Sequence, residues 1–280
     1  MTNKNHNSKR DNGFRPNKLL GQNFLISQDA LKKIIETAEL SLDDTIIEVG
    51  AGDGTLTLAI AEKTKLVLAV EKDKKFASLL QKIIGERGIK NIIIINGDIL
   101  KFSPEKFAEK LKTYKLIGNI PYYLTSRLLR KFLAEEKLKP KEIILTVQKE
   151  VAKRIVARPP HMNLLALSVQ AYGKPEIIEK IPASAFWPKP KVDSAIIKIS
   201  GISDDFFVKN KIEQKKIFSI IKTAFSQKRK TLANSLSKFY GDKKTSEEKI
   251  KKSGLAPSAR PEELSLEGWM KLLRSPDPKT

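Results

Sequence analysis

Residues 46–55 read Ile46-Ile47-Glu48-Val49-Gly50-Ala51-Gly52-Asp53-Gly54-Thr55, an apolar run followed by three closely spaced glycines. The apolar run is typical of a strand buried on both faces, and a helical pattern begins directly after the glycines. Glycines in a turn between a strand and a helix let the backbone approach a ligand closely. The segment therefore predicts an α/β fold with a ligand site at the end of this strand.

Two acidic residues follow the next two predicted strands. Glu71 lies 21 residues after Gly50, close to the ~20-residue spacing at which an acidic side chain receives the ribose hydroxyls of a nucleoside ligand. Asp98 could accept a hydrogen bond from an adenine amino group, and its surroundings, Asn96-Gly97-Asp98, are equally typical of a simple turn. The third glycine comes one residue too early for the dinucleotide fingerprint. A nucleoside that lacks a pyrophosphate, such as S-adenosylmethionine, therefore fits better than a dinucleotide.

Short apolar runs alternate with amphipathic segments over residues 25–200, which is typical of a parallel sheet covered by helices. The predicted strands are residues 45–49, 66–70, 92–95, 115–118 and 143–147, and the predicted helices are residues 31–39, 56–63, 75–84, 104–111 and 125–133. Residues 164–171 and 192–199 are interpreted as two further strands that form a closing antiparallel hairpin. We therefore expect an α/β domain with a mostly parallel sheet of about seven strands.

The pattern changes after Gly201, where residues 211–225, 231–239, 246–253 and 264–273 have helical spacing and are separated by Gly and Pro. We place a domain boundary near Ser200. Residues 1–17 are then a flexible basic tail, residues 18–200 the α/β domain and residues 201–280 a small helical domain. This last domain is locally very basic, so it either lines an RNA cleft or carries a solvated charged face.

The charge balance favours a polyanionic partner, because 53 Lys and Arg against 32 Asp and Glu leave a formal net charge of +21. The absence of cysteine excludes disulfides, cysteine-ligated metal sites and thiol nucleophiles, and with only two histidines we expect no metal centre. No apolar stretch approaches the ~20 residues needed to span a bilayer, and the start of the chain lacks the apolar core of a signal peptide. We therefore expect a cytoplasmic protein without membrane contact.

A second motif, Gly118-Asn119-Ile120-Pro121-Tyr122-Tyr123, ends the fourth predicted strand, on the side where open α/β sheets bind ligands. An exocyclic base amine is a poor nucleophile because its lone pair is delocalised into the ring. Hydrogen-bond acceptors such as the Asn119 side-chain carbonyl and the Pro121 backbone carbonyl favour a more nucleophilic nitrogen. Tyr122 can stack on the base and hold it outside the duplex. Alone, the motif is more typical of a rigid turn with a buried tyrosine, but together with Gly50, Glu71 and Asp98 at successive strand ends it favours a nucleobase site.

Together these motifs resemble the small-subunit (16S-type) rRNA adenine N6,N6-dimethyltransferase family, and the resemblance covers nearly the whole sequence. The matching segments are Leu20-Gly21-Gln22-Asn23-Phe24-Leu25, residues 50–54, Glu71, Asp98, residues 119–122, Phe186-Trp187-Pro188-Lys189-Pro190-Lys191-Val192-Asp193-Ser194 and Ala224-Phe225-Ser226-Gln227-Lys228-Arg229-Lys230-Thr231-Leu232. The resemblance implies a Rossmann-like class I methyltransferase domain. It also implies transfer of methyl groups from S-adenosylmethionine to N6 of two adjacent adenosines in a hairpin near the 3′ end of small-subunit rRNA, late in subunit biogenesis. Two methyl groups on each of the two bases require four molecules of S-adenosylmethionine.

The resemblance assigns roles to single residues. The residues implied to bind the cofactor are Gln22, Asn23, Leu25, Gly50, Gly52, Glu71, Asp98 and Asn119, with Gly50 by the methionine portion, Glu71 on the ribose and Asp98 on the adenine. The residues implied to hold the target base are Asn119, Pro121, Tyr122 and, on the other face of the base, Phe186. An ordinary core position is an equally good interpretation of Phe186. The residues implied to contact rRNA phosphates are Lys189, Lys191, Lys228, Arg229 and Lys230, which makes residues 201–280 an RNA-binding domain.

One segment departs from the family pattern, because many members have a Gly-Ser-Lys loop where this chain has Arg158-Pro159-Pro160-His161-Met162-Asn163. RNA contacts at this loop can therefore differ. Two other functions stay open: a large-subunit rRNA adenine N6-methyltransferase of the antibiotic-resistance type, and a ribosome-assembly factor in which catalysis is secondary. Residues 224–232 and 260–264 favour the small-subunit enzyme. We expect a monomer whose partners are small-subunit rRNA and the small ribosomal subunit.

Overall fold

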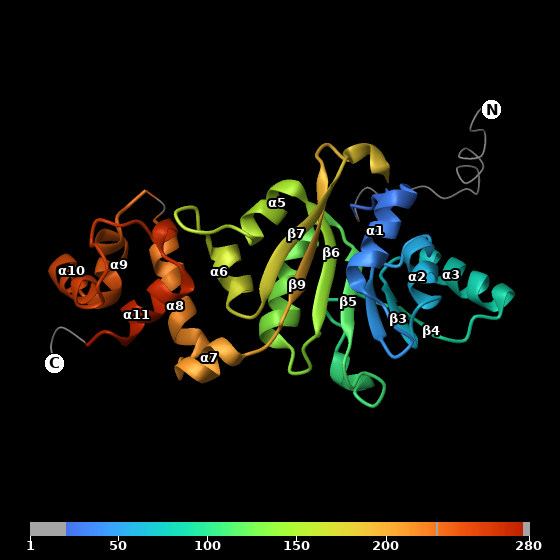
Figure 1. The fold of residues 1–280 in the computed structure, drawn as a ribbon, viewed down its shortest axis with the longest axis horizontal. Coiled ribbons are helices and arrows are strands. Elements are labelled where there is room, and N and C mark those ends of the chain that lie inside the picture. Colours follow the sequence, from blue (N-terminus) through green and yellow to red (C-terminus); the bar gives the residue numbers. More distant parts are fainter. Residues whose placement is uncertain (1–20, 228, 277–280) are drawn as a thin grey trace.

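A seven-stranded sheet forms the centre of the computed structural model, which describes residues 21–227 and 229–276 (Figure 1). Its strands are β2 (Thr45–Val49), β3 (Leu66–Glu71), β4 (Ile92–Asn96), β5 (Lys115–Asn119), β6 (Glu142–Gln148), β7 (Lys174–Ile181) and β9 (Ser194–Ser200). They lie in the order β4-β3-β2-β5-β6-β9-β7. The strands β2 to β6 are parallel, and β9 is antiparallel to both of its neighbours. This confirms the predicted mostly parallel sheet of seven strands.

Helices cover both faces of the sheet, so its central strands are buried on each side. The helices α1 (Gln28–Ala38), α2 (Thr55–Ala61) and α3 (Lys74–Arg87) cover one face, and α4 (Thr125–Arg130), a π-helical turn (Lys131–Glu135), α5 (Lys149–Ile155) and α6 (Leu164–Gln170) cover the other. Within β2, Ile46 points to the first layer and Ile47 and Val49 point to the second. Apolar residues at successive positions are therefore needed here, as in parallel strands generally.

Residues 164–171, predicted to be a strand, form helix α6 instead. The Asn163 side chain accepts a hydrogen bond from the backbone N–H of Ala166 at 3.1 Å and so caps the helix. Four of the seven residues of α6 are buried, so its apolar run looks like that of a buried strand. The hairpin partner of β9 is β7, an edge strand in which four of the eight residues are charged, so that it has no continuous apolar run. The predicted helix 104–111 is also shorter, because only Pro104–Phe107 form a 3-10 turn.

A second, two-stranded sheet joins segments that are distant in the sequence. Strand β1 (Phe24–Leu25) pairs antiparallel with β8 (Phe186–Trp187), in the register Phe24 with Trp187 and Leu25 with Phe186. The chain just before α1 is thereby fixed to the connection between β7 and β9.

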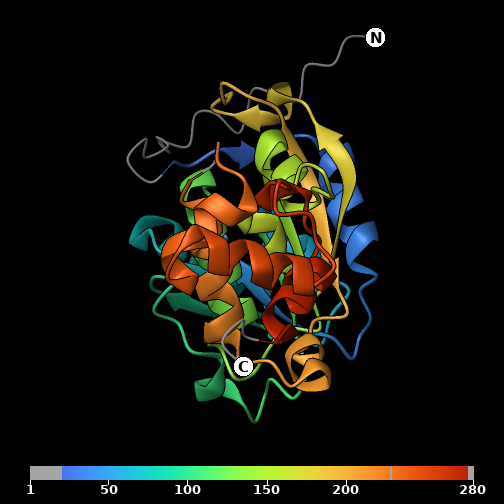
Figure 2. The same ribbon diagram turned by 90° about the vertical axis from the view of Figure 1, so that its left-hand side faces the viewer.

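The helices that follow Ser200 lie beyond the β7 edge of the sheet (Figure 1) and stand in front of it when viewed from that end (Figure 2). They are α7 (Asp205–Asn210), α8 (Gln214–Phe225), α9 (Leu232–Tyr240), α10 (Lys243–Lys252) and α11 (Leu266–Arg274). Their buried residues, such as Ile220 and Trp269, belong to the same core cluster as α4 to α6. The Met162 N–H also donates to the Glu262 carbonyl at 2.8 Å, so the atypical loop 158–163 contacts the helical part. In the part of the chain described, no helix has the length and apolar character needed to cross a membrane.

Candidate active site

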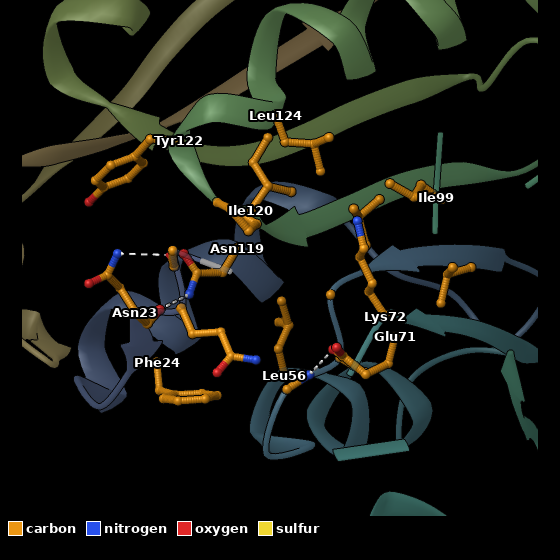
Figure 3. Close-up of a pocket in the computed structure, with 18 of the residues that line it drawn as sticks. Asn23, Phe24, Leu56, Glu71, Lys72, Ile99, Asn119, Ile120, Tyr122 and Leu124 are labelled. Atoms are coloured by element: carbon orange, nitrogen blue, oxygen red, sulfur yellow. Dashed lines mark hydrogen bonds between the residues drawn. The ribbon is translucent and has the colours of Figure 1, made fainter. Parts of the chain in front are cut away.

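A pocket lies at the carboxyl ends of β2 to β5, where the loops after these strands meet residues 21–25 (Figure 3). The strand order reverses between β2 and β5, and open α/β sheets bind their ligands at such a point. The lining includes ten of the residues assigned above to the cofactor or the target base: Gln22, Asn23, Leu25, Gly50, Gly52, Glu71, Asp98, Asn119, Pro121 and Tyr122. The fold therefore brings both predicted motifs into a single cavity.

The glycine turn between β2 and α2 has little space for side chains. Gly54 has φ of +81°, and a Cβ placed there would lie 2.6 Å from a methyl carbon of Leu80. Gly52 has φ of +53°, and its Cβ would lie 3.1 Å from the Phe24 ring. Side chains rarely adopt these φ values, so glycine is needed for the turn itself as well as for close approach of a ligand.

Glu71 ends β3 and is held in the pocket by two backbone groups. One carboxylate oxygen accepts the N–H of Gly52 at 2.9 Å, and the other accepts the N–H of Asp73 at 2.7 Å. The residue is 5% exposed, and this burial raises the pKa of the Glu71 carboxyl while the two N–H donors act in the opposite direction. The carboxylate is thus fixed between the glycine turn and the start of α3, with oxygen lone pairs left over for a ligand.

Asp98 follows β4 and forms an ion pair across the rim of the pocket. One carboxylate oxygen accepts the N–H of Leu100 at 3.0 Å, and the other lies 2.9 Å from the Lys72 ammonium. Partial burial acts to raise the pKa of Asp98, but the hydrogen bonds from Lys72 and Leu100 outweigh it and lower the pKa below its ordinary value. Asp98 is therefore an ionised acceptor at neutral pH.

Asn119, the last residue of β5, is oriented by a bond to the opposite wall. Its side-chain N–H donates to the Asn23 backbone carbonyl at 2.8 Å, and the Asn23 side chain in turn donates to the Gly21 carbonyl at 3.3 Å (Figure 3). Because the nitrogen of the Asn119 amide is used in this way, the orientation of the amide is set. Its oxygen is the atom left to accept a hydrogen bond from a ligand amine.

Tyr122 is half-buried and lies on the same side of the pocket as Asn23, opposite Glu71 and Lys72 (Figure 3). Its hydroxyl is 2.8 Å from the Ser194 hydroxyl, and burial raises the pKa of the phenol, so Tyr122 stays neutral. The Pro121 carbonyl accepts the Leu124 N–H at 2.9 Å and so closes the turn. Pro121, predicted to accept from a base amine, therefore has one lone pair already in use.

Phe186 lies in the core: the residue is 3% exposed and belongs to the cluster beneath α1 and α2. The core interpretation of this residue is the one that matches its burial. Phe24, which carried no assigned role, does line the pocket, with its ring 5.1 Å from that of Phe76 and 6.4 Å from that of Trp187. The sequence could have pointed to Phe24 only through its position inside the matching segment 20–25.

The predicted phosphate-binding residues lie on two loops. Lys189 and Lys191 are exposed between β8 and β9, and Arg229 and Lys230 are exposed between α8 and α9. Both loops lie at the top of the molecule in Figures 1 and 2, on the same side as β1 and β8. Lys228 and the tail 1–17 fall outside the described residues. Among the residues that are described, no group of three or more His, Cys, Asp or Glu is arranged to hold a metal ion.

Curated proteins of two bacterial genera are similar to most of the chain. It is 42% identical over 260 residues to the ribosomal RNA small subunit methyltransferase A of Dehalococcoides mccartyi (strain CBDB1), a match that covers 92% of this chain and 88% of the relative. It is 40% identical over 262 residues to the protein of the same name from Clostridium botulinum (strain Okra), with 92% and 93% covered.

Two solved structures have a similar fold. The 23S rRNA methyltransferase ErmE matches with a TM-score of 0.70 at 25% identity, over 90% of this chain and 98% of its own. A dimethyladenosine transferase from Plasmodium falciparum matches with a TM-score of 0.76 at 24% identity, over 89% and 95% of the two chains. The predicted Rossmann-like methyltransferase architecture with a helical C-terminal part is thereby confirmed. A family model described as ribosomal RNA adenine dimethylase matches residues 13–275, and the chain belongs to this family.

Proposed function

We propose that the protein transfers methyl groups from S-adenosylmethionine to N6 of two adjacent adenosines in a hairpin near the 3′ end of small-subunit rRNA, late in small-subunit biogenesis. The observation that carries the proposal is that a single pocket has Asn119 and Tyr122 on one side and Glu71 and Lys72 on the other, with Asp98 paired to Lys72. A flipped base suits the first side, and a ligand with a ribose and an adenine suits the second. The names of the curated relatives support methylation of small-subunit rRNA, and the description of the family model supports dimethylation of adenine.

The residues present fit the cofactor. When bound, S-adenosylmethionine supplies an electrophilic methyl group. Two backbone N–H groups hold the Glu71 carboxylate in place, and it can accept hydrogen bonds from the ribose hydroxyls. Asp98 offers an ionised carboxylate to the adenine amine. At Gly50 a Cβ would meet only the Asn119 carbonyl oxygen, at 4.0 Å, so the turn leaves open space there for the methionine portion.

Asn119 acts on the reacting nitrogen of the target base. Because its amide nitrogen is bound to the Asn23 carbonyl, its oxygen is presented to an N6 hydrogen. An accepted hydrogen bond draws the N6 lone pair out of conjugation and lets it point toward the methyl donor. Tyr122 supplies a face on which the adenine stacks, and its hydroxyl is held by Ser194. No strong base is required, because the methylated ammonium is itself acidic.

The rRNA would contact the two basic loops. Lys189 and Lys191 are exposed on one loop and Arg229 and Lys230 on the other, and both loops lie at the top of the molecule in the two ribbon views (Figures 1 and 2). Two separate clusters suit a folded RNA better than a short linear one. Lys228 is proposed to join them, and residues 201–280 are proposed as the RNA-binding domain. The monomeric state and the cytoplasmic location stay predictions.

The large-subunit alternative shares the fold, as the match to ErmE illustrates, so the fold does not separate the two substrates. The names of the curated relatives favour the small subunit. The test is incubation with labelled S-adenosylmethionine and, separately, unmethylated small subunits, naked small-subunit rRNA and large-subunit rRNA, followed by nucleoside mass spectrometry. N6,N6-dimethyladenosine in small subunits alone is expected, and label in large-subunit rRNA would contradict the proposal.

The assembly-factor alternative is tested with the Asn119→Ala variant. If catalysis is the main role, this variant binds small subunits but leaves their adenosines unmethylated and their maturation impaired. Normal maturation with the variant would show that RNA docking is the primary function and catalysis a secondary one.

A further inference from the structure

The ion pair between Lys72 and Asp98 spans the end of the pocket where the adenine of the cofactor is proposed to bind. Both residues line the pocket, and they come from the loops after β3 and β4. The Lys72 ammonium lies 2.9 Å from one oxygen of Asp98, while the Leu100 N–H holds the other oxygen at 3.0 Å. Each oxygen of the expected adenine acceptor therefore already has one donor in the ligand-free protein, and the exposed Lys72 ammonium is the one that a ligand amine can displace.

The pair is placed to open. The side chains of Lys72 and Asp98 are 55% and 25% exposed, and ion pairs in contact with solvent contribute little to stability. The Arg127 guanidinium also lies close enough to repel the Lys72 ammonium. In Figure 3, the Lys72 side chain stands on the Glu71 side of the pocket, away from Tyr122 and Asn23. An exchange of partners at Asp98 therefore leaves the site of the target base undisturbed.

We propose that Lys72 competes with the adenine amine of the cofactor for the Asp98 carboxylate. This inference rests on the proposed function, since it requires a ligand with an adenine. Binding then replaces the ammonium donor with the ligand amine, and part of the affinity is lost to the broken ion pair. The demethylated product carries the same adenine, so Lys72 weakens the binding of cofactor and product alike. An enzyme that consumes four cofactors for each substrate gains faster exchange from this competition.

The test is calorimetric binding of S-adenosylmethionine and of S-adenosylhomocysteine to the parent protein, to Lys72→Met and to Lys74→Met, each at about 50 and 300 mM salt. Lys74 is the matched control, because it is an exposed lysine at the start of α3. In Lys72→Met the ligand no longer has to break an exposed ion pair, so both ligands should bind about two- to fivefold more tightly at low salt. The difference should shrink at high salt, where the ion pair of the parent is screened.

Three further outcomes separate the possible explanations. Equal or weaker binding to Lys72→Met than to Lys74→Met would overturn the proposal, since Lys72 would then be neutral or a ligand itself. When Asp98 is already replaced by Asn, adding Lys72→Met should no longer tighten ligand binding. If it still did, removal of the positive charge of Lys72 would act by general electrostatics and not by competition at Asp98. If the parent protein bound neither ligand, the proposed function would fail instead.

Discussion

Replacement of Glu48 by glutamine should remove a pH dependence of stability that originates inside the sheet. Glu48 is fully buried in β2, where its register neighbours are Ala69 and Ile117. Burial, together with the nearby charges of Glu71 and Asp53, raises the pKa of its carboxyl from 4.5 to about 8. At neutral pH the folded protein therefore holds a proton that the unfolded chain has released.

The sign and size of the effect follow from this difference in pKa. Because the pKa is raised in the folded state, the contribution of Glu48 to the free energy of unfolding becomes less favourable as pH rises from 4.5 toward 8. Integration between pH 5.5 and 8 gives a loss of about 3 kcal/mol for a single group with these two pKa values. Glutamine has nearly the same shape and does not ionise, so the variant should lack this loss.

The assay is urea unfolding of the parent and of Glu48→Gln at pH 5.5 and at pH 8, with Glu62→Gln as an exposed control at the end of α2. The other titratable groups are the same in the parent and in Glu48→Gln, so their effects cancel when the free energies of unfolding of the two proteins are subtracted. Between the two pH values, the free energy of unfolding of the parent should fall by about 3 kcal/mol relative to Glu48→Gln. Parallel pH profiles for the parent and this variant would refute the reasoning, whatever the absolute stability of the variant.

Two other substitutions test the pocket, and a third tests the packing of the strands beneath it. Glu71→Ala should weaken S-adenosylmethionine binding about 10- to 100-fold, because hydrogen bonds to a charged group contribute about 1.5–3 kcal/mol each, and unchanged affinity in calorimetry would contradict this role. Asn119→Ala should lower the single-turnover rate about a hundredfold with little change in cofactor affinity, and an equal loss in both would make Asn119 mainly a cofactor ligand. Gly118→Ala should destabilise the protein by about 1–3 kcal/mol in urea unfolding, because the added Cβ would lie 2.7 Å from the Val49 carbonyl oxygen; unaltered stability would show that β2 and β5 can separate.

The strands that carry the site could be predicted from the sequence because their apolar runs end in recognisable turns. The glycine turn and the motif at Asn119 mark the ends of β2 and β5, and both line the pocket. Helix α6 was mistaken for a strand because it packs between the sheet and α8 and so lacks a polar face. Edge strand β7 was missed for the opposite reason, since solvent on one side permits charged residues along it.

Within the site, residue types were easier to predict than their partners. The bond from Asn119 to the Asn23 carbonyl joins residues 96 positions apart, and no local pattern contains that information. The ion pair of Lys72 with Asp98 likewise depends on the adjacency of β3 and β4. The burial of Phe186 follows from its packing in the cluster beneath α1 and α2, which only the tertiary structure determines.

The position of β9 between β6 and β7 has a consequence for synthesis of the chain. Strand β7 leaves the ribosome before β9, yet in the described part of the molecule β9 is the neighbour that joins it to the sheet. The two strands are therefore expected to form a hairpin first and to dock on β6 together, after residue 200 has emerged. Until then β6 is an unpaired edge, open to association with other nascent chains. The hairpin connection carries Lys189 and Lys191, so the loop that is proposed to contact RNA and the closed sheet arise in the same folding step.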